Sequence, residues 1–276
     1  MRRISLIELP YDSGRLGERM GQGPIALLKR GLAERLRSVG CTVDVASVCL
    51  PQGLHIEAGA LIQLQRLTVP LVRNAVERHS RPILLSGNCG PAALSAMAAL
   101  AGIRPGIVWF DAHADFNTPE TSPSGYLDGM GLAILTGRCW RRLAEQFESF
   151  RPVPDSDIIQ VGVRENDPPE IELINQSNIH RIACSEISKL STVLQQVRRE
   201  TVYVHVDMDV VDTSEGRAND WARPGGLSVT HLCDALDLIG RRVPIVAGAI
   251  TCYDPAVDAD GRIGAAIPHI VELLAR

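Results

Sequence analysis

The segment GIVWFDAHADFN, residues 106–117, joins an apolar run to a cluster of polar side chains. Its first five residues are apolar and include β-branched and aromatic types, which predicts a buried strand. In the extended chain that follows, alternate side chains point the same way, so Asp111, His113 and Asp115 can converge on one point. The segment therefore predicts a strand with a metal site at its carboxyl end.

A second segment repeats this arrangement. Residues 201–206 form another apolar run and lead into Asp207 and Asp209, again two carboxylates at a spacing of two. Four carboxylates at two strand ends repel one another unless they are protonated or neutralised, and two divalent cations would balance their charge. Oxygen ligands with one imidazole favour Mn²⁺ over Fe²⁺, Co²⁺ or Zn²⁺. The alternative is a pair of solvated acidic turns, since Asp commonly ends strands.

Composition restricts the class of protein. The chain has 276 residues with 45% hydrophobic content, which is enough to bury a full core, and its formal net charge is −4. No basic stripe indicates a nucleic-acid partner, and no apolar run of about eighteen or more residues indicates a membrane span. The N-terminus meets Glu8 and Pro10 too early for a signal peptide. Seven cysteines without CxxC spacing indicate free thiols in a reducing compartment, so we expect a cytoplasmic protein.

Apolar runs that alternate with helical patterns predict an α/β fold with a mainly parallel sheet and helices on both faces. The expected strands cover residues 3–9, 42–48, 82–86, 106–110, 157–162, 201–206 and 244–250. The expected helices cover residues 24–39, 59–80, 90–101, 169–176, 186–199, 229–240 and 268–275. No linker or repeat divides the chain, which predicts a single domain over residues 1–276. Because ligands of such sheets bind beyond the carboxyl ends of the strands, we expect the loops 115–127 and 210–228 to wall a cleft.

The chain resembles the arginase and agmatinase family, the ureohydrolases, over nearly its whole length. DAHADFN at residues 111–117 matches the family's DAHxDxN element, and HVDMDVVD at residues 205–212 resembles its second metal element. GGLS at residues 225–228 is similar to the loop after that element. The resemblance implies a three-layer α/β sandwich of the arginase and deacetylase type, assembled as a homo-oligomer, either a trimer or a hexamer.

The resemblance also implies a chemistry. Two Mn²⁺ ions that share a water lower its pKa, and a metal-bound hydroxide then attacks a guanidino or amidino carbon to release urea or a related product. The implied metal ligands are Asp111 and Asp207 as bridges, Asp115 in one site, and His113 with Asp209 in the other.

Two departures from the family replace polar side chains with thiols. Cys89, in SGNCG at residues 86–90, stands where the family presents a histidine ligand. A thiolate suits Zn²⁺ better than Mn²⁺, so one ion instead of two is an alternative, as is an inert buried thiol. Cys252 stands where the family carries a glutamate that clamps the guanidinium, and losing that charge should cost about 2–5 kcal/mol of recognition. A less basic N-hydroxyguanidine would lose less recognition energy from this replacement. Cys89 also resembles the cysteine found at this position in hydroxyarginine-hydrolysing amidinohydrolases of antibiotic pathways.

A third departure puts Asp128 in the place of arginase's proton-shuttling histidine. Asp128 either shuttles a proton itself, if its pKa is raised, or caps a helix that begins near Gly129. Four other positions match substrate-binding residues of arginases: Asn117 and Ser124 for the α-carboxylate, and Asp167 and Glu170 for the α-amino group. They favour a small-molecule amino acid over agmatine as substrate, although an Asp before two prolines, as at Asp167, is also ordinary turn chemistry.

The leading hypothesis is a Mn²⁺-dependent amidinohydrolase. It would act on arginine or a modified arginine such as N-hydroxyarginine and give ornithine and urea or hydroxyurea. The alternatives are hydrolysis of another linear amidine, such as agmatine or formiminoglutamate, and a non-catalytic or regulatory paralogue that keeps the fold. A metal-dependent deacetylase of the same broad fold would need an upstream pair of catalytic histidines, which the sequence lacks.

Overall fold

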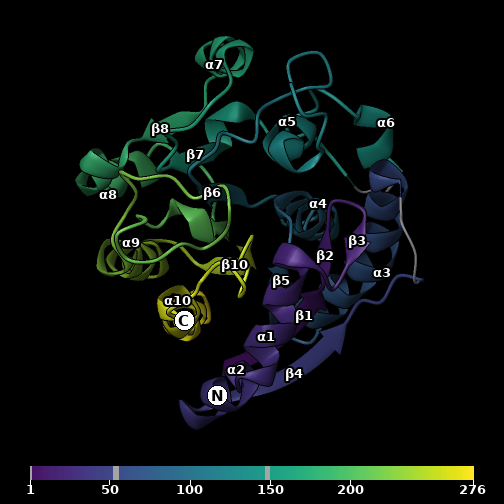
Figure 1. The fold of residues 1–276 in the computed structure, drawn as a ribbon, viewed down its shortest axis with the longest axis vertical. Helices are drawn as coiled ribbons and strands as arrows, with labels where there is room; N and C mark the ends of the chain where they lie inside the picture. The colour runs from purple at the N-terminus through teal and green to yellow at the C-terminus, as the bar shows by residue number, and fades with distance from the viewer. Residues whose placement is uncertain (1, 52–55, 147–149) are drawn as a thin grey trace.

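One parallel sheet crosses the molecule from β4 at one end to β8 at the other (Figure 1). The computed structural model describes residues 2–51, 56–146 and 150–276. Eight strands of this part of the chain form the sheet, and every neighbouring pair is parallel. In spatial order they are β4 (Cys41–Ser47), β1 (Arg2–Leu9), β5 (Arg81–Ser86), β10 (Ile245–Thr251), β9 (Val202–Asp207), β6 (Gly106–Phe110), β7 (Ile158–Val161) and β8 (His180–Ile182). All the predicted strands form, and β8 and the short hairpin of β2 (Tyr11–Asp12) and β3 (Arg15–Leu16) are additional.

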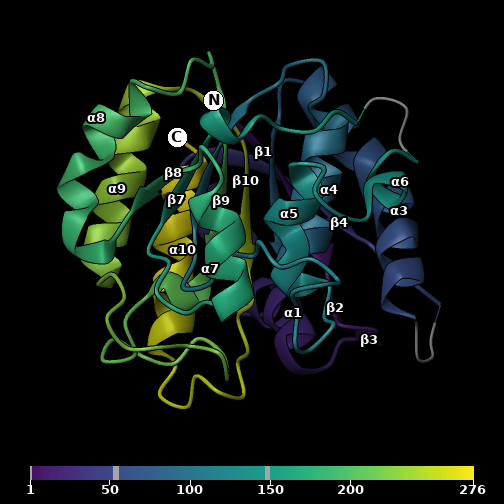
Figure 2. The ribbon, with the colours of Figure 1, turned by 90° about the horizontal axis from the view of Figure 1, so that it is seen from above.

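Helices cover both faces of the sheet (Figure 2). One face packs against α3 (Glu57–Glu77), α4 (Cys89–Ala99), α5 (Gly131–Leu135) and α6 (Arg141–Ala144). The other face packs against α1 (Gln22–Lys29), α2 (Leu32–Ser38), α8 (Leu190–Leu194), α9 (Val229–Arg242) and α10 (Arg262–Leu274). Each face has its own cluster of buried apolar side chains, because a parallel sheet is apolar on both sides. The predicted three-layer α/β sandwich is confirmed. No helix in the described ranges is both long and apolar enough to cross a membrane.

Three predicted helices have different limits in the structure. The helix expected over 24–39 is two helices, since Gly31 between them has a φ of 86° that breaks the helical path. The helix expected over 186–199 is a 3₁₀ turn, Cys184–Lys189, followed by α8, which stops at Leu194. The helix expected over 268–275 begins six residues earlier, at Arg262.

In α10, Pro268 lies inside the helix, where a proline is normally unfavourable. Ile263 and Ile267, on the preceding turns, are fully buried against the sheet. The burial of this apolar face outweighs the local cost of the proline, so the helix does not start at Pro268 as the sequence suggested.

The order of the four central strands sets the position of the functional site. Ser86 of β5 pairs with Thr251 of β10, and Thr251 pairs with Asp207 of β9. Phe110 of β6 pairs with Val206 of β9. The residues that follow these strands therefore emerge side by side at the carboxyl edge of the sheet, which is where such sheets bind ligands.

Candidate metal centre

A cleft of about 260 Å³ opens at the carboxyl edge of the central strands. Its lining includes all of the predicted site residues except Asp111, namely Cys89, His113, Asp115, Asn117, Ser124, Asp128, Asp167, Glu170, Asp207, Asp209 and Cys252. Asp111 is only 1% exposed and follows β6 directly. Both loops that the sequence placed on the cleft wall, 115–127 and 210–228, contribute residues to it.

The first group of candidate ligands consists of Asp111, His113 and Asp209. Their ligand atoms all lie within 4.8 Å of one another. Nδ1 of His113 is 3.2 Å from Oδ2 of Asp209 and 3.5 Å from Oδ1 of Asp111. Burial lowers the pKa of His113, but the two carboxylates outweigh it and raise that pKa to about 12. A proton on His113 thus lies between two buried carboxylates, and a divalent cation can take the same position.

The second group shares Asp111 and adds Cys89 and Asp115, again with ligand atoms within 4.8 Å. Oδ2 of Asp115 is buried and has no hydrogen-bond partner, which is costly for a carboxylate. Burial and the nearby carboxylates raise the pKa of Asp115 well above its usual value. Asp115 also has a φ of 50°, a left-handed conformation that is uncommon outside glycine and is often found at functional sites.

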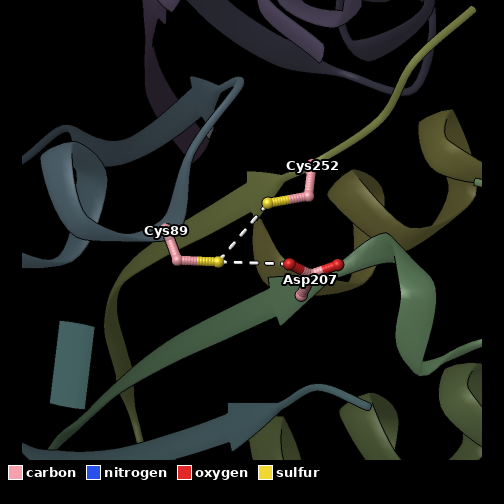
Figure 3. A group of neighbouring side chains, drawn as sticks. All are labelled: Cys89, Asp207 and Cys252. Atoms are coloured by element: carbon pink, nitrogen blue, oxygen red, sulfur yellow. Dashed lines mark hydrogen bonds between the residues drawn. The ribbon is translucent and has the colours of Figure 1, made fainter. Parts of the chain in front are cut away.

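The third group brings two thiols together. Cys89 at the start of α4, Asp207 at the end of β9 and Cys252 just after β10 point toward one another (Figure 3). Sγ of Cys89 lies 3.5 Å from Sγ of Cys252 and 3.2 Å from Oδ2 of Asp207. Burial raises the pKa of both thiols well above the usual range. Cys252, like Asp115, has a left-handed backbone, with a φ of 58°.

Buried aromatic side chains support the carboxylates from below the cleft. Nε1 of Trp109 donates a hydrogen bond to Oδ2 of Asp111 at 3.0 Å. The Trp109 ring stacks on His205, with centroids 3.7 Å apart. Burial lowers the pKa of His205 to about 3, so this imidazole is neutral and serves as a hydrogen-bonding group within the core. Partners of this kind orient a ligating side chain.

Asp128 does not cap the helix near Gly129, because no side-chain hydrogen bond caps the 3₁₀ turn Asp128–Met130. Its carboxylate instead accepts from the backbone N–H of Cys89 at 2.7 Å and from Nδ2 of Asn88 at 2.6 Å. Asp128 therefore caps α4, whose first residue is Cys89. Burial and the charge of Asp12 raise the pKa of Asp128 to about 7. A carboxyl with this pKa beside a cleft can exchange a proton near neutral pH.

The residues expected to bind the amino-acid head lie farther along the cleft. Nδ2 of Asn117 donates to Oδ2 of Asp167 at 2.9 Å. Asp167 and Glu170 form a capping box at the start of α7 (Pro168–Asn175). Oε1 of Glu170 also accepts from the backbone N–H of Phe116 at 2.8 Å. Glu170 is thus a positioning residue that ties α7 to the DAHADFN loop, and Ser124 is exposed at the rim with Ser122 as its neighbour.

The cleft also has lining residues that the sequence did not single out, and three of them are Asn219, Arg19 and Trp221. Asn219 donates to the backbone carbonyl of Cys252 at 2.7 Å and reaches Oδ2 of Asp209 at 3.5 Å. Arg19 lines the entrance and pairs with the buried Asp12 at 3.2 Å. Trp221 is 45% exposed at the rim. Asn219 and Trp221 lie in the 210–228 loop that was expected to wall the cleft, but no motif distinguished them from their neighbours.

The two roles of Asp167, helix cap and substrate contact, can be separated by substitution. We expect Asp167→Ala to lose about 1 kcal/mol of unfolding free energy, since it removes a cap. Asp167→Asn should keep most of that stability, because asparagine caps helices well, but it removes the charge that is expected to face the α-amino group of a substrate. Chemical denaturation and the KM of the substrate measure the two effects separately. If Asp167→Asn leaves KM unchanged, the residue is only a helix cap.

The parallel sheet and the three groups at its carboxyl edge are those of an α/β protein with candidate metal-ligand clusters. A model of the Arginase family matches residues 2–274, and the chain belongs to this family, which is a family of hydrolases. An arginase of Staphylococcus aureus (strain COL) is 28% identical over 278 residues, covering 93% of this chain and 91% of the relative. The crystal structure of an arginase from Bacillus subtilis superposes with a TM-score of 0.88 at 25% identity, covering 100% of this chain and 98% of the other. A Bacillus subtilis formimidoylglutamase shares the fold at 17% identity, with a TM-score of 0.76, covering 100% of this chain and 86% of the other.

Proposed function

We propose that this chain is a divalent-metal-dependent amidinohydrolase. It hydrolyses a guanidino or amidino C–N bond in arginine or in a modified arginine such as N-hydroxyarginine, and its products are ornithine and urea or hydroxyurea. The observation that carries the proposal is the convergence of Asp111, His113 and Asp209 on one point in a cleft. The same cleft holds Asn117 and Asp167, which suit an amino-acid head group.

The donor set of the first group fits Mn²⁺, because two carboxylates and one imidazole are hard or borderline ligands. The unpartnered Oδ2 of Asp115 supports a second cation nearby, with Asp111 shared between the two positions. On that side, however, Cys89 supplies a thiol, which does not fit Mn²⁺. When bound, the cations supply a water of lowered pKa and withdraw charge from the amidine.

The residues of the chain orient the substrate and move its protons. Asn117, whose Nδ2 carries a second hydrogen beyond its bond to Asp167, binds the α-carboxylate with Ser124. Asp167 faces the α-amino group. Asp128, with its pKa raised to about 7 and Oδ2 3.9 Å from Sγ of Cys252, holds a proton at the guanidino end and gives it to the leaving amine.

The thiol of Cys252 favours a weakly basic substrate. Cys252 carries no carboxylate, so its sulfur, whether a free thiol or bound to a metal, leaves a buried guanidinium without a carboxylate partner, which is costly. An N-hydroxyguanidine is less basic, so it gives up its proton more readily before binding. We therefore propose N-hydroxyarginine ahead of arginine.

Other parts of the proposal rest on the family resemblance and on composition. We propose a single-domain protein that works in the cytoplasm, where its seven cysteines stay reduced. We also propose a homo-oligomer, a trimer or a hexamer. Sedimentation velocity of the purified chain measures this assembly directly.

A substrate screen tests the function. Metal-free protein is loaded with Mn²⁺, Zn²⁺ or both, and turnover is measured on arginine, N-hydroxyarginine, agmatine, guanidinobutyrate and formiminoglutamate. We expect the highest kcat/KM on N-hydroxyarginine. If the fully metallated protein turns over none of the five compounds, the proposal is contradicted and a non-catalytic paralogue is favoured. The thiols of Cys89 and Cys252, which replace family residues, are the reason to consider that alternative.

A further inference from the structure

Cys89 and Cys252 lie 163 positions apart in the chain and meet because their strands are neighbours. Cys89 follows β5 after a two-residue turn and begins α4, while Cys252 comes directly after β10. Both thiols are buried, with exposed fractions of 1% and 3%, and Asp207 at the end of β9 completes the group. Figure 3 shows the three side chains facing a common point. Two thiols and a carboxylate thus form a compact group of donors.

The spacing of these donors fits a tetrahedral cation with sulfur ligands. Two sulfurs bound to Zn²⁺ lie about 3.8 Å apart, and a sulfur and a carboxylate oxygen lie about 3.6 Å apart. The corresponding separations here are 3.5 Å between the two sulfurs and 3.2 Å between Sγ of Cys89 and Oδ2 of Asp207. Adjustments of a few tenths of an ångström would bring the donors to these values.

Burial raises the pKa of the free Cys89 thiol, but its neighbours suit a sulfur that is bound to a metal. Cys89 is the first residue of an eleven-residue helix, whose N-terminus stabilises negative charge. Its sulfur is 3.2 Å from Oγ1 of Thr251, which is 3.1 Å from Nε2 of His205, and Nδ1 of His205 is 3.0 Å from the Tyr203 hydroxyl. In one tautomer of His205 these bonds run in a single direction, from the tyrosine O–H to the sulfur. Such partners fix and support a metal ligand.

A second, independent observation points to a cation at this place. Oδ2 of Asp115 is buried without a hydrogen-bond partner, and Asp115 groups with Cys89 within 4.8 Å. A buried carboxylate oxygen with no donor is rare in a folded protein. A cation held by Cys89 would lie next to this carboxylate, which shares a candidate group with Cys89 and Asp111.

We propose that Cys89, Cys252 and Asp207 form a Zn²⁺ site beside the Mn²⁺-type group of Asp111, His113 and Asp209. Thiolates select Zn²⁺ over Mn²⁺, and binding releases the two thiol protons to solvent. The centre is then a mixed one: the second cation position, the one next to Asp115, is rich in sulfur, and the position of Asp111, His113 and Asp209 is rich in oxygen. This inference goes beyond the proposed function, since it depends on metal binding and not on turnover.

X-ray absorption of the reduced, wild-type chain loaded with one equivalent of Zn²⁺ tests the site without any substitution. We expect two sulfur neighbours of the zinc at about 2.3 Å. A spectrum with only nitrogen and oxygen neighbours would overturn the proposal. The measurement uses no substrate, so its result does not depend on whether the protein hydrolyses an amidine. Conversely, a spectrum without sulfur neighbours would exclude the zinc site and would not test metal binding by Asp111, His113 and Asp209.

Titration with Co²⁺ assigns the ligands. We expect a thiolate-to-metal charge-transfer band that saturates at one equivalent, disappears on addition of Zn²⁺ and persists in excess Mn²⁺. Cys252→Ala should weaken Zn²⁺ binding by at least about 100-fold, more than the loss of a supporting partner. Cys139→Ser, which removes another buried thiol outside the group, should leave affinity and band unchanged. A band of full intensity in Cys252→Ala would show that other thiols bind the metal and would exclude the proposed site.

Discussion

Asp111→Asn is expected to lower kcat/KM on the preferred amidine by a factor of roughly 10³ or more, and to lower the metal content of the protein. Asp111 is the only residue shared by the group with His113 and Asp209 and the group with Cys89 and Asp115 among the described residues. Asparagine keeps the size of the side chain and an oxygen for the Trp109 N–H, so folding should survive. In the proposed function the two cation positions together supply several kcal/mol of transition-state stabilisation, and the lost charge should weaken both.

Plasma mass spectrometry and steady-state kinetics on the same preparations measure this effect. Asp157→Asn is a matched control, because Asp157 is also a buried aspartate but pairs with Arg199 just before β7, at the opposite edge of the sheet. It should lose stability and keep both metal content and kcat/KM. Unchanged metal content in Asp111→Asn would mean that Asp111 is not a shared ligand and that the assignment of the centre is wrong.

Cys252→Glu should shift substrate preference toward arginine. We expect the ratio of kcat/KM for arginine to that for N-hydroxyarginine to rise by about 30-fold or more, which corresponds to the lower end of the energy of a buried charge pair. A carboxylate at this position can pair with the guanidinium, which the thiol cannot. The backbone is already left-handed with a side chain in place, at a φ of 58°, so glutamate adds no new type of backbone strain.

Cys252→Gln is the control for this exchange, because it has the same length as glutamate and no charge. The ratio should rise with Glu and not with Gln. If the ratio of kcat/KM for arginine to that for N-hydroxyarginine is equal in the two variants, charge at position 252 does not set substrate preference. The proposed preference for a weakly basic substrate would then be wrong. Adding Cys89→His to Cys252→Glu also tests the non-catalytic alternative, which predicts that the double variant remains inactive on every amidine.

The sequence by itself determined the strands and the ligand elements. Strands show in the sequence because buried parallel strands are continuous apolar runs. Asp111 lies close to His113 in one group and to Asp115 in another, but the expected convergence of all three on one point is wrong, because His113 and Asp115 belong to different groups. The backbone is left-handed at Asp115, with a φ of 50°, so the alternation of an extended segment does not hold there. The helix limits were less predictable. α10 extends through Pro268 because the burial of its apolar face stabilises the helix by more than the proline destabilises it.

Only the tertiary structure decided how separate segments combine. The meeting of Cys89 with Cys252 depends on β5 lying beside β10, although several strands separate them along the chain. Asp128 caps α4, which begins 39 residues earlier, and not its own turn. Strand order is set by how the whole sheet buries its two faces and by its crossover connections, which no local pattern encodes. The sequence therefore fixes which donors exist, and the packing of the sheet decides which of them share a cation.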